Sequence, residues 1–404
     1  MTLASLLLRR RRWDPAILGA GTLCLSLLVS AGKIAFLFFA LCGLYLLVAR
    51  PRSLRGAPTV FMGALAAWAL WQIGLSLLRG EPLDGNRVLS YAGLQFACAV
   101  LPLGLALVRH PAMMLAFGAR IGLLALAVLA PIEYALTGMR VGLGKNEAIF
   151  AFVVGAVAVL ARLPTGGRLR YLPDGRFWTY LGAVPIALSG TRAAMLLFVI
   201  TALLDLRRSV PRLRSHGKRA AVALVGGLMA ATAAAVPVGG FLIDRVEQGV
   251  SEMDAYETTG LAVGSVDTRL AMWSAAVRVL SEHPFVGVGG TERMMRVAEE
   301  AGPNGAQVLR YQHLHNIVLD EALSSGLIGL ALMGSVLVAF LSGVFRRAGD
   351  PAVRDACVAL VAFTFVFGLF HGVLLNEWMV LVIFAGMGII LVELRRPRPF
   401  GNPA

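Results

Sequence analysis

The sequence predicts an all-α integral membrane protein with about 12 transmembrane helices. Its 404 residues are 58% hydrophobic and 15% charged, whereas a soluble domain carries about 25% charged residues. Apolar runs long enough to cross a bilayer recur along the chain. They are continuous rather than alternating, which favours helices over a β-barrel. Residues 1–404 are therefore expected to form one polytopic membrane domain.

The cationic residues predict how the spans are oriented. Of the 37 Lys and Arg residues, 24 fall in every second gap between apolar runs, 12 fall in the alternate gaps, and Arg120 lies inside a span. Short cytoplasmic loops are enriched in Lys and Arg, so both termini are expected in the cytoplasm. The net charge of +14 reflects this orientation rather than nucleic-acid binding. No small-residue cleavage site follows the first span, which predicts an uncleaved signal-anchor.

The expected spans follow one another along the chain as continuous apolar runs, with the charged residues gathered in the gaps between them. All four cysteines fall inside these runs, which makes them packing residues rather than disulfide or metal-binding residues. The spans cover residues 16–32, 33–49, 58–78, 91–108, 112–136, 147–163, 177–190, 193–206, 219–240, 316–345, 352–371 and 374–394.

The seventh and eighth spans are unusually short. Their apolar parts hold 13 and 14 residues, which reach only about 20 Å against a hydrocarbon core of about 30 Å. Arg176 and Arg207 tie their inner ends to the cytoplasmic surface, so the outer turn that carries Arg192 is expected to lie below the outer surface. A cation at that depth is costly unless it faces a polar cavity or an anion. Arg192 is therefore a candidate anion-binding residue, the alternative being an arginine that merely ends a helix.

A 74-residue outer connection, residues 241–314, follows the ninth span. A connection of this length is expected to contain structure. Apolar residues recur at helical spacing in residues 267–282, and Asp267 can cap that helix. Residues 291–301 predict a second short helix, whereas residues 241–266 give no clear pattern.

Four outward cations and one histidine are the candidate site residues. Arg192 and Arg269 can bind oxyanions through two parallel hydrogen bonds, and Arg140 and Lys145 flank a glycine-rich turn. His315 starts the tenth span and can exchange a proton near neutral pH. Each residue also has a plain structural explanation: a solvated loop residue for Arg269, a polar turn for Arg140 and Lys145, and a helix-end histidine for His315.

Metal binding is not expected. His313 and His315 are two residues apart, and no Cys or His nearby completes a zinc site. The carboxylates near the outer helix ends are Glu133, Asp320 and Glu321, and no DxD pair occurs in an outer loop. His313, Asn316 and Asp320 are expected to support His315 rather than to bind a metal.

The residues around His315 resemble a known family. His315-Asn316, nine residues and then Gly326-Leu327-Ile328-Gly329 match the H-[NSQ]-x9-G-x-x-[GTY] signature of bacterial O-antigen ligases. The turn at residues 189–194 is similar to the arginine turn of that family, and residues 269–289 resemble its R-x3-W…P-x2-G-x-G stretch. The resemblance covers residues 180–340. Gly326 and Gly329 are expected to let helices pack closely.

The resemblance implies an inverting, metal-independent glycosyltransferase without a cofactor. Its architecture would be similar to that of GT-C enzymes, with a large periplasmic loop between helices 9 and 10. The donor would be a glycan on undecaprenyl diphosphate and the acceptor lipid A–core, at the periplasmic face of the bacterial inner membrane. His315 would take the proton of the acceptor hydroxyl, and Arg192, Arg269, Arg140 and Lys145 would neutralise the diphosphate.

The sequence is also compatible with other functions. An O-antigen polymerase would use the same donor with a lipid-linked repeat as acceptor, and an O-oligosaccharyltransferase would need a groove for a peptide hydroxyl. A secondary transporter would show repeated halves and a site at the midplane, whereas here the halves differ and the polar residues gather at one face. A non-catalytic scaffold would leave the recessed Arg192 unexplained.

Overall fold

The computed structural model describes residues 3–396, apart from residues 106–107, 217–257, 259 and 263. Within these residues the chain forms helices and no strands. The predicted all-helical class is therefore confirmed. The predicted span at residues 219–240 lies outside the described residues, as does most of the segment 241–266.

The helices are named in chain order. They are α1 (Leu3–Leu27), α2 (Val29–Ala49), η1 (Pro51–Gly56), α3 (Thr59–Leu78), α4 (Arg87–Gly104), α5 (Pro111–Thr137), α6 (Glu147–Ala161), α7 (Phe177–Leu181), α8 (Ala183–Ser189), α9 (Arg192–His216), α11 (Ser265–Glu282), α12 (Arg293–Glu300), η3 (Gly302–Asn304), α13 (Gly305–Val308), α14 (Ile317–Arg347), α15 (Pro351–Gly368), η4 (Val373–Leu375) and α16 (Glu377–Leu394).

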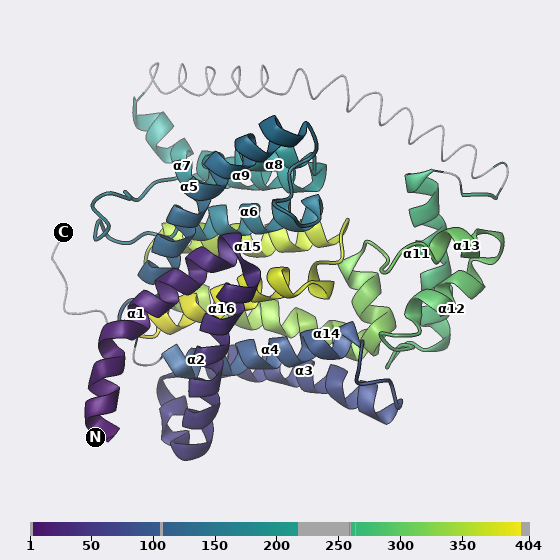
Figure 1. Ribbon diagram of the computed structural model, residues 1–404, viewed down its shortest axis with the longest axis horizontal. Helices are drawn as coiled ribbons and strands as arrows, with labels where there is room; N and C mark the ends of the chain where they lie inside the picture. The colour runs from purple at the N-terminus through teal and green to yellow at the C-terminus, as the bar shows by residue number, and fades with distance from the viewer. Residues whose placement is uncertain (1–2, 106–107, 217–257, 259, 263, 397–404) are drawn as a thin grey trace.

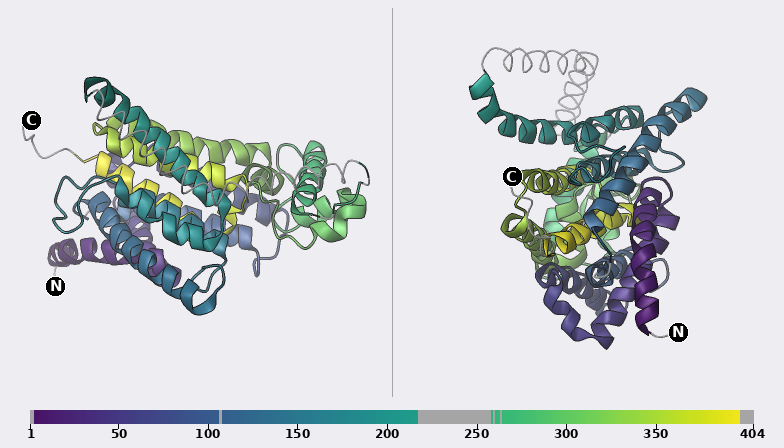
Figure 2. Two further views of the ribbon diagram at one scale, coloured as in Figure 1. Left: turned by 90° about the horizontal axis from the view of Figure 1, so that it is seen from above. Right: turned by 90° about the vertical axis from the view of Figure 1, so that its left-hand side faces the viewer.

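Most of the long helices lie side by side in a bundle, and α11, α12 and α13 form a separate group beyond one end of it (Figures 1 and 2). Seven of the described helices are long and apolar enough to cross a membrane: α2, α3, α4, α5, α14, α15 and α16. Two shorter apolar helices are α6 and the pair α7–α8. The chain is thus a multi-pass membrane protein, whereas the total of 12 spans stays a prediction.

The helix ends differ from the predicted span boundaries at several places, and two of these have a clear physical cause. The break between the first two spans falls at Leu28 rather than at residues 32–33, because Lys33 lies inside α2 and is ion-paired with Glu377 at 2.6 Å. The eighth span was expected to end at residue 206, but α9 continues to His216. A helix can extend beyond its apolar part when charged residues such as Arg207 reach water, so apolarity alone does not set its end.

The core of the bundle is built around α16. Every residue from Trp378 to Val392 is buried, and the helix packs against α4, α5, α6 and α14. A helix that is apolar on all sides is expected in the interior rather than at the surface. All residues of α6 from Phe150 to Ala161 are likewise buried. Because α6 and α16 are held in the core, the positions of their first residues are fixed. These first residues matter for the site.

Arg120 explains how the bundle holds a cation inside α5. Its side chain is fully buried and donates hydrogen bonds to the carbonyls of Ala161, Leu163 and Leu172 and to Asp174. The Ala161 carbonyl lies at the end of α6, where helical partners are missing. Arg120 is therefore a structural link between α5, the end of α6 and the connection that follows.

The connection between α11 and α12 crosses α14 at a break in that helix. Gly326 has φ 74° and ψ −177°, and a Cβ at this position would meet the carbonyl of Phe285. The Leu327 N–H donates to the Pro284 carbonyl at 2.8 Å and the Val288 N–H to the Leu323 carbonyl at 2.7 Å. Gly326 thus allows a loop, not a neighbouring helix, to approach closely.

Candidate active site

A cavity of about 1000 Å³ lies where several helices begin. Glu147 and Glu377 open α6 and α16 and line it, as do the asparagines that cap α4, α6 and α16. These are Asn86, Asn146 and Asn376, whose side chains accept hydrogen bonds from first-turn N–H groups. Helix starts carry a partial positive charge. The convergence of three of them favours an anion, although the two glutamates offset part of this charge.

Three histidines gather on one wall of the cavity: His313, His315 and His371. The ring centroid of His315 lies 4.2 Å from that of His313 and 6.0 Å from that of His371. His315 has φ 53°, a left-handed conformation that is uncommon outside glycine. Such a conformation at a site residue is a sign that the surrounding structure imposes the position of the side chain.

All three imidazoles are held in their neutral form near pH 7. Burial, with the charges of Arg293 and Arg269, lowers the pKa of His313 to about 4. Burial, with His313 and Arg269, likewise lowers the pKa of His315 to about 4. Burial, with His315 and Arg269 as the next largest causes, lowers the pKa of His371 to about 3. A neutral imidazole can accept a proton, which is the state that a general base needs.

The segment before α14 is held from several sides. The indole N–H of Trp273 in α11 donates to the Leu314 carbonyl at 2.8 Å. The Leu314 N–H donates to Asp320 at 3.0 Å, and Arg293 donates to the Gln312 carbonyl at 3.3 Å. These contacts come from α11, α12 and α14, so three helices fix the two histidines that flank Leu314.

Arg293 is a site residue that the sequence did not single out. It lines the cavity, is 4% exposed, and donates to the Gly290 carbonyl and the Ser324 hydroxyl. Its Nε lies 3.5 Å from an oxygen of Asp320. A buried ion pair at the rim of a cavity is a frequent feature of functional sites. Asp320 therefore supports the histidine segment both directly and through Arg293.

The other predicted residues lie at different distances from this cavity. Arg140 lines it, and its Nε donates to the Ser189 carbonyl at 2.8 Å, in the turn that precedes α9. Arg269 lies close enough to the three histidines to lower their pKa values. Arg192 and Lys145 are exposed and are not among the lining residues. The structure thus brings Arg140 to the histidines and leaves Arg192 and Lys145 outside the lining.

Asn316, which does not line the cavity, and the lining residues Arg87 and His371 complete the arrangement. Asn316 caps α14, accepting from the N–H groups of Val318 and Leu319. Arg87, at the start of α4, donates to the side chain of Gln312. His371 follows α15 and was not expected at the site. In the sequence, the asparagines before α4, α6 and α16 are a usable signal for where these three helices start. The order of the helices along the chain does not show that the three starts meet.

Among the residues that the structure describes, no group of three or more His, Cys, Asp or Glu side chains is arranged to hold a metal ion. The three neighbouring histidines are included in that statement. The interpretation that no metal takes part stays a prediction from the sequence.

Comparison with protein families matches residues 178–334 to the family described as O-antigen ligase. The match covers less than half of the chain, and it shows that this segment is similar to O-antigen ligases. No curated protein matches the chain. The O-antigen ligase segment contains Arg192, Arg269, Arg293, His313 and His315.

O-antigen ligases and the related polymerases are membrane enzymes of the glycosyltransferase type, and their substrates are in general a lipid-linked glycan and an acceptor such as lipid A–core. In this protein Arg140 and His371 line the cavity from outside the matched segment. The cavity therefore combines the family segment with residues of the flanking helices.

Proposed function

We propose that the cavity is the active site of an O-antigen ligase that transfers a glycan from undecaprenyl diphosphate to a sugar hydroxyl of lipid A–core. The observation that carries this proposal is the meeting of His315, Arg140 and Arg293 in one cavity at the starts of three helices. A base and an anion-binding surface are the two parts that this reaction needs.

The anionic leaving group would lie against the cationic side of the cavity. Arg140 and Arg293 line it and Arg269 is close to the histidines. We assign the diphosphate to Arg192, Arg269 and Arg140, with Lys145 as a further contact, and we add Arg293. The exposed Arg192 and Lys145 would meet phosphate or lipid headgroup at the cavity mouth. Cations aimed at a leaving diphosphate stabilise the charge that develops as the bond breaks.

His315 would act as the general base. It takes the proton of the acceptor hydroxyl while the oxygen forms a bond to the anomeric carbon, on the face opposite the diphosphate. The bond between that carbon and the diphosphate oxygen breaks, and its electron pair stays with the diphosphate. The configuration at the anomeric carbon is inverted, and no metal or cofactor is required for this step.

Donor binding would also improve the base. A pKa of about 4 makes free His315 a weak proton acceptor, because burial and neighbouring positive charge disfavour the imidazolium. A bound diphosphate adds negative charge close to the same ring, and an opposite charge at a few ångströms raises the pKa of a cationic acid. The proton transfer is thereby favoured only when the donor is in place.

We further infer a GT-C-like architecture and a periplasmic active site at the inner membrane. The excess of cations on the opposite face supports this orientation. The histidine segment is bonded to α11 and α12, which lie beyond one end of the bundle (Figure 2). With this orientation the site faces the compartment in which lipid-linked glycans and lipid A–core meet.

The test uses purified protein in nanodiscs with undecaprenyl-diphosphate-linked glycan and lipid A–core, without added metal or nucleotide. A ladder of glycosylated lipid A–core, absent with His315→Ala, is the expected result. Longer glycan still attached to undecaprenyl diphosphate would instead indicate a polymerase, and transfer to a peptide would indicate an O-oligosaccharyltransferase. No transfer with a competent donor would contradict the enzyme assignment and favour transport.

A further inference from the structure

A second cavity lies beside the first one and shares a wall with it. Its volume is about 430 Å³, and Thr291 lines both cavities. The other lining residues come from the end of α3 and the connection after it, with Arg79 and Glu81, from the α11–α12 connection, and from the start of α12, with Glu292 and Arg296. This volume falls within the range of about 300–1,000 Å³ that is common for small-ligand sites.

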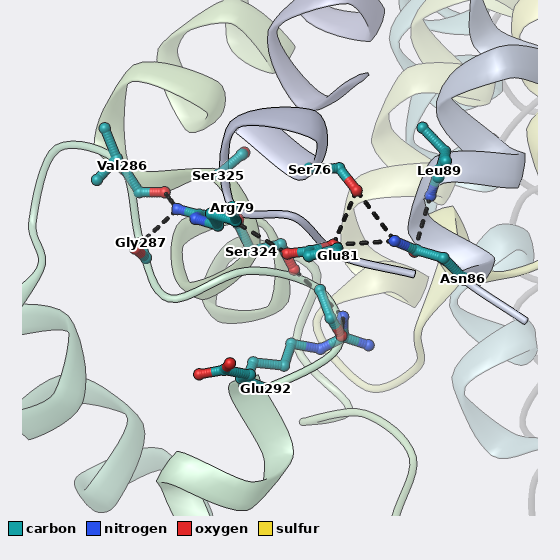
Figure 3. A network of polar contacts seen from close by, with 12 residues as sticks. Ser76, Arg79, Glu81, Asn86, Leu89, Val286, Gly287, Glu292, Ser324 and Ser325 are labelled. Carbon is teal, nitrogen blue, oxygen red and sulfur yellow. Dashed lines mark hydrogen bonds and ion pairs between the residues drawn. The ribbon is translucent and has the colours of Figure 1, made fainter. Parts of the chain in front are cut away.

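One wall of this cavity is rigidly built. Arg79 donates to the backbone carbonyls of Val286, Gly287 and Ser324, so its guanidinium joins the end of α3 to the α11–α12 connection and to α14. Figure 3 shows Arg79 and Glu81 in one row, with Arg79 directed to the 286–287 backbone and Glu81 to Ser76 and Asn86.

Glu81 is held on its own side of the row by two hydrogen bonds. Its Oε2 accepts from the Ser76 hydroxyl and from the Asn86 amide, both at 2.9 Å. A Cβ at Gly289 would meet the other oxygen of Glu81, so the backbone of the α11–α12 connection passes directly over this carboxylate. A wall fixed in this way loses little conformational entropy when a ligand binds.

The opposite wall offers groups that a ligand can reach. Glu292 and Arg296 form an ion pair at 3.7 Å, and their side chains are 53% and 52% exposed. The lining also includes the exposed side chains of Thr291 and His283. In Figure 3, Glu292 stands apart from the Arg79–Glu81 row. Carboxylate, guanidinium, imidazole and hydroxyl groups together provide both donors and acceptors.

The charge of this cavity differs from that of the first one. Glu81 and Glu292 balance Arg79 and Arg296, whereas the first cavity is lined by Arg87, Arg140 and Arg293 beside two glutamates and three neutral histidines. Two carboxylates would repel a diphosphate but would accept hydrogen bonds from hydroxyl groups. A polar, balanced cavity of this size therefore suits a polyhydroxylated ligand.

We propose that the second cavity is a carbohydrate subsite. It binds sugar rings of a substrate whose reacting end lies in the first cavity, and the shared wall at Thr291 connects the two. This inference rests on the proposed function, because it takes the ligand of the first cavity to be a glycan. The sugar rings come either from the donor, beyond its first sugar, or from the outer part of the acceptor core.

The variant pair for the test leaves the rigid wall intact. Glu292→Gln with Arg296→Gln removes both exposed charges and keeps the side-chain sizes. The matched control is Glu300→Gln with Arg278→Gln, which removes another exposed ion pair of the α11–α12 group that lines neither cavity. Both double variants remove one carboxylate and one guanidinium and are expected to fold like the parent.

The first measurement compares KM and kcat for short and long substrates. Donors with one and with several repeat units are tested, and acceptors with a truncated and with a complete outer core. In the Glu292/Arg296 variant, KM for one of the long substrates should rise about tenfold, as expected for lost hydrogen bonds to charged groups. Its kcat, and the KM of the short substrates, should stay within about twofold of the parent, since these bonds lie outside the reacting end.

The outcome of this measurement either assigns the subsite to one substrate or overturns it. An effect that depends on donor length assigns the subsite to the donor glycan, and one that depends on the core assigns it to the acceptor. An unchanged length dependence, or the same change in the Glu300/Arg278 control, overturns the subsite. An equal loss with short and long substrates also overturns it, because the two residues would then act on the structure as a whole.

A second measurement separates the subsite from the proposed function. Free O-antigen oligosaccharide and free core oligosaccharide are added to the protein in nanodiscs, and binding is followed by saturation-transfer NMR. Binding should persist in His315→Ala and be lost in the Glu292/Arg296 variant. Such binding without any transferase activity would leave the subsite standing and refute the ligase. If glycan transfer occurs but neither oligosaccharide shows binding that depends on Glu292 and Arg296, the subsite is refuted and the ligase function stands.

Discussion

Arg120 and Arg293 are both almost completely buried, yet their surroundings differ in one respect. Arg120 donates to three carbonyls and to Asp174. Around Arg293, three buried polar atoms lack a hydrogen-bond partner within the described residues: Arg293 Nε, Asp320 Oδ2 and His315 Nδ1. A buried polar group without a partner is destabilising, and its retention needs an explanation. The comparison indicates that Arg120 serves the fold, and we infer that the groups around Arg293 serve the proposed site.

The largest expected effect is on catalysis. His315→Ala should lower kcat/KM for glycan transfer by about 10²–10⁴-fold, the usual contribution of a positioned acid or base. Expression and melting temperature should change little, because the ring is only partly buried. His110→Ala is the matched control, since His110 lies outside the cavity lining. Transfer by His315→Ala at near the parental rate would remove the base from the proposed mechanism.

The two arginines should separate stability from activity. Arg120→Leu leaves three carbonyls and Asp174 without their donor, and a buried acceptor left without a partner typically costs about 1–3 kcal/mol. The melting temperature in detergent should fall, whereas the folded fraction should keep its kcat. Arg293→Gln should instead lower kcat/KM by about 10²-fold with a smaller change in melting temperature. Equal loss of stability in both variants would erase the distinction between them.

The pH dependence follows from the lowered pKa values of the histidines. At pH 5 the folded protein keeps His313, His315 and His371 neutral, since their pKa values lie at about 4, 4 and 3. In the unfolded chain they bind protons below about pH 6.5, so the unfolded state takes up more protons. Stability should therefore fall as the pH decreases from about 6.5 toward 4. Chemical denaturation at several pH values measures this, and the His315→Ala variant should show a weaker dependence.

The same histidines sharpen the proposed link between donor and base. In the free enzyme His315 should titrate near pH 4, whereas with the diphosphate donor bound its pKa should be higher. The pH profile of kcat should then fall at a higher pH than that of kcat/KM, because the former reports the complex and the latter the free enzyme. Coincident profiles would mean that the donor does not change the charge around His315.

The smallest effect is expected outside the cavity lining. Arg192→Ala should raise KM for the donor by up to about fivefold, since exposed charge contacts contribute up to about 1 kcal/mol. The control is Arg207→Ala, in the C-terminal half of α9, which should leave KM for the donor unchanged. Donor binding that is equally strong in Arg192→Ala and in the parent would take Arg192 out of the diphosphate assignment.

Local patterns predicted much of the helical structure but only part of the site. The apolar spacing in residues 267–282 corresponds to α11, Ser265–Glu282, and residues 291–301 contain α12, Arg293–Glu300. These helices depend on neighbouring residues, which the sequence displays directly. The break near Lys33 could not be predicted, because a cation inside a helix and a cation in a loop look alike in one dimension. Only the contact with Glu377 distinguishes them.

The sequence by itself determined the all-helical membrane class, the orientation expected from its cations, and the family resemblance around His315. Each depends on composition or on residues that are close along the chain. Only the tertiary structure decided that Arg293 and His371 share a cavity with His315, and that Arg120 is satisfied. Such neighbours are far apart along the chain, and their meeting depends on how the helices pack, because side-chain burial and hydrogen bonding across elements are not encoded in local periodicity.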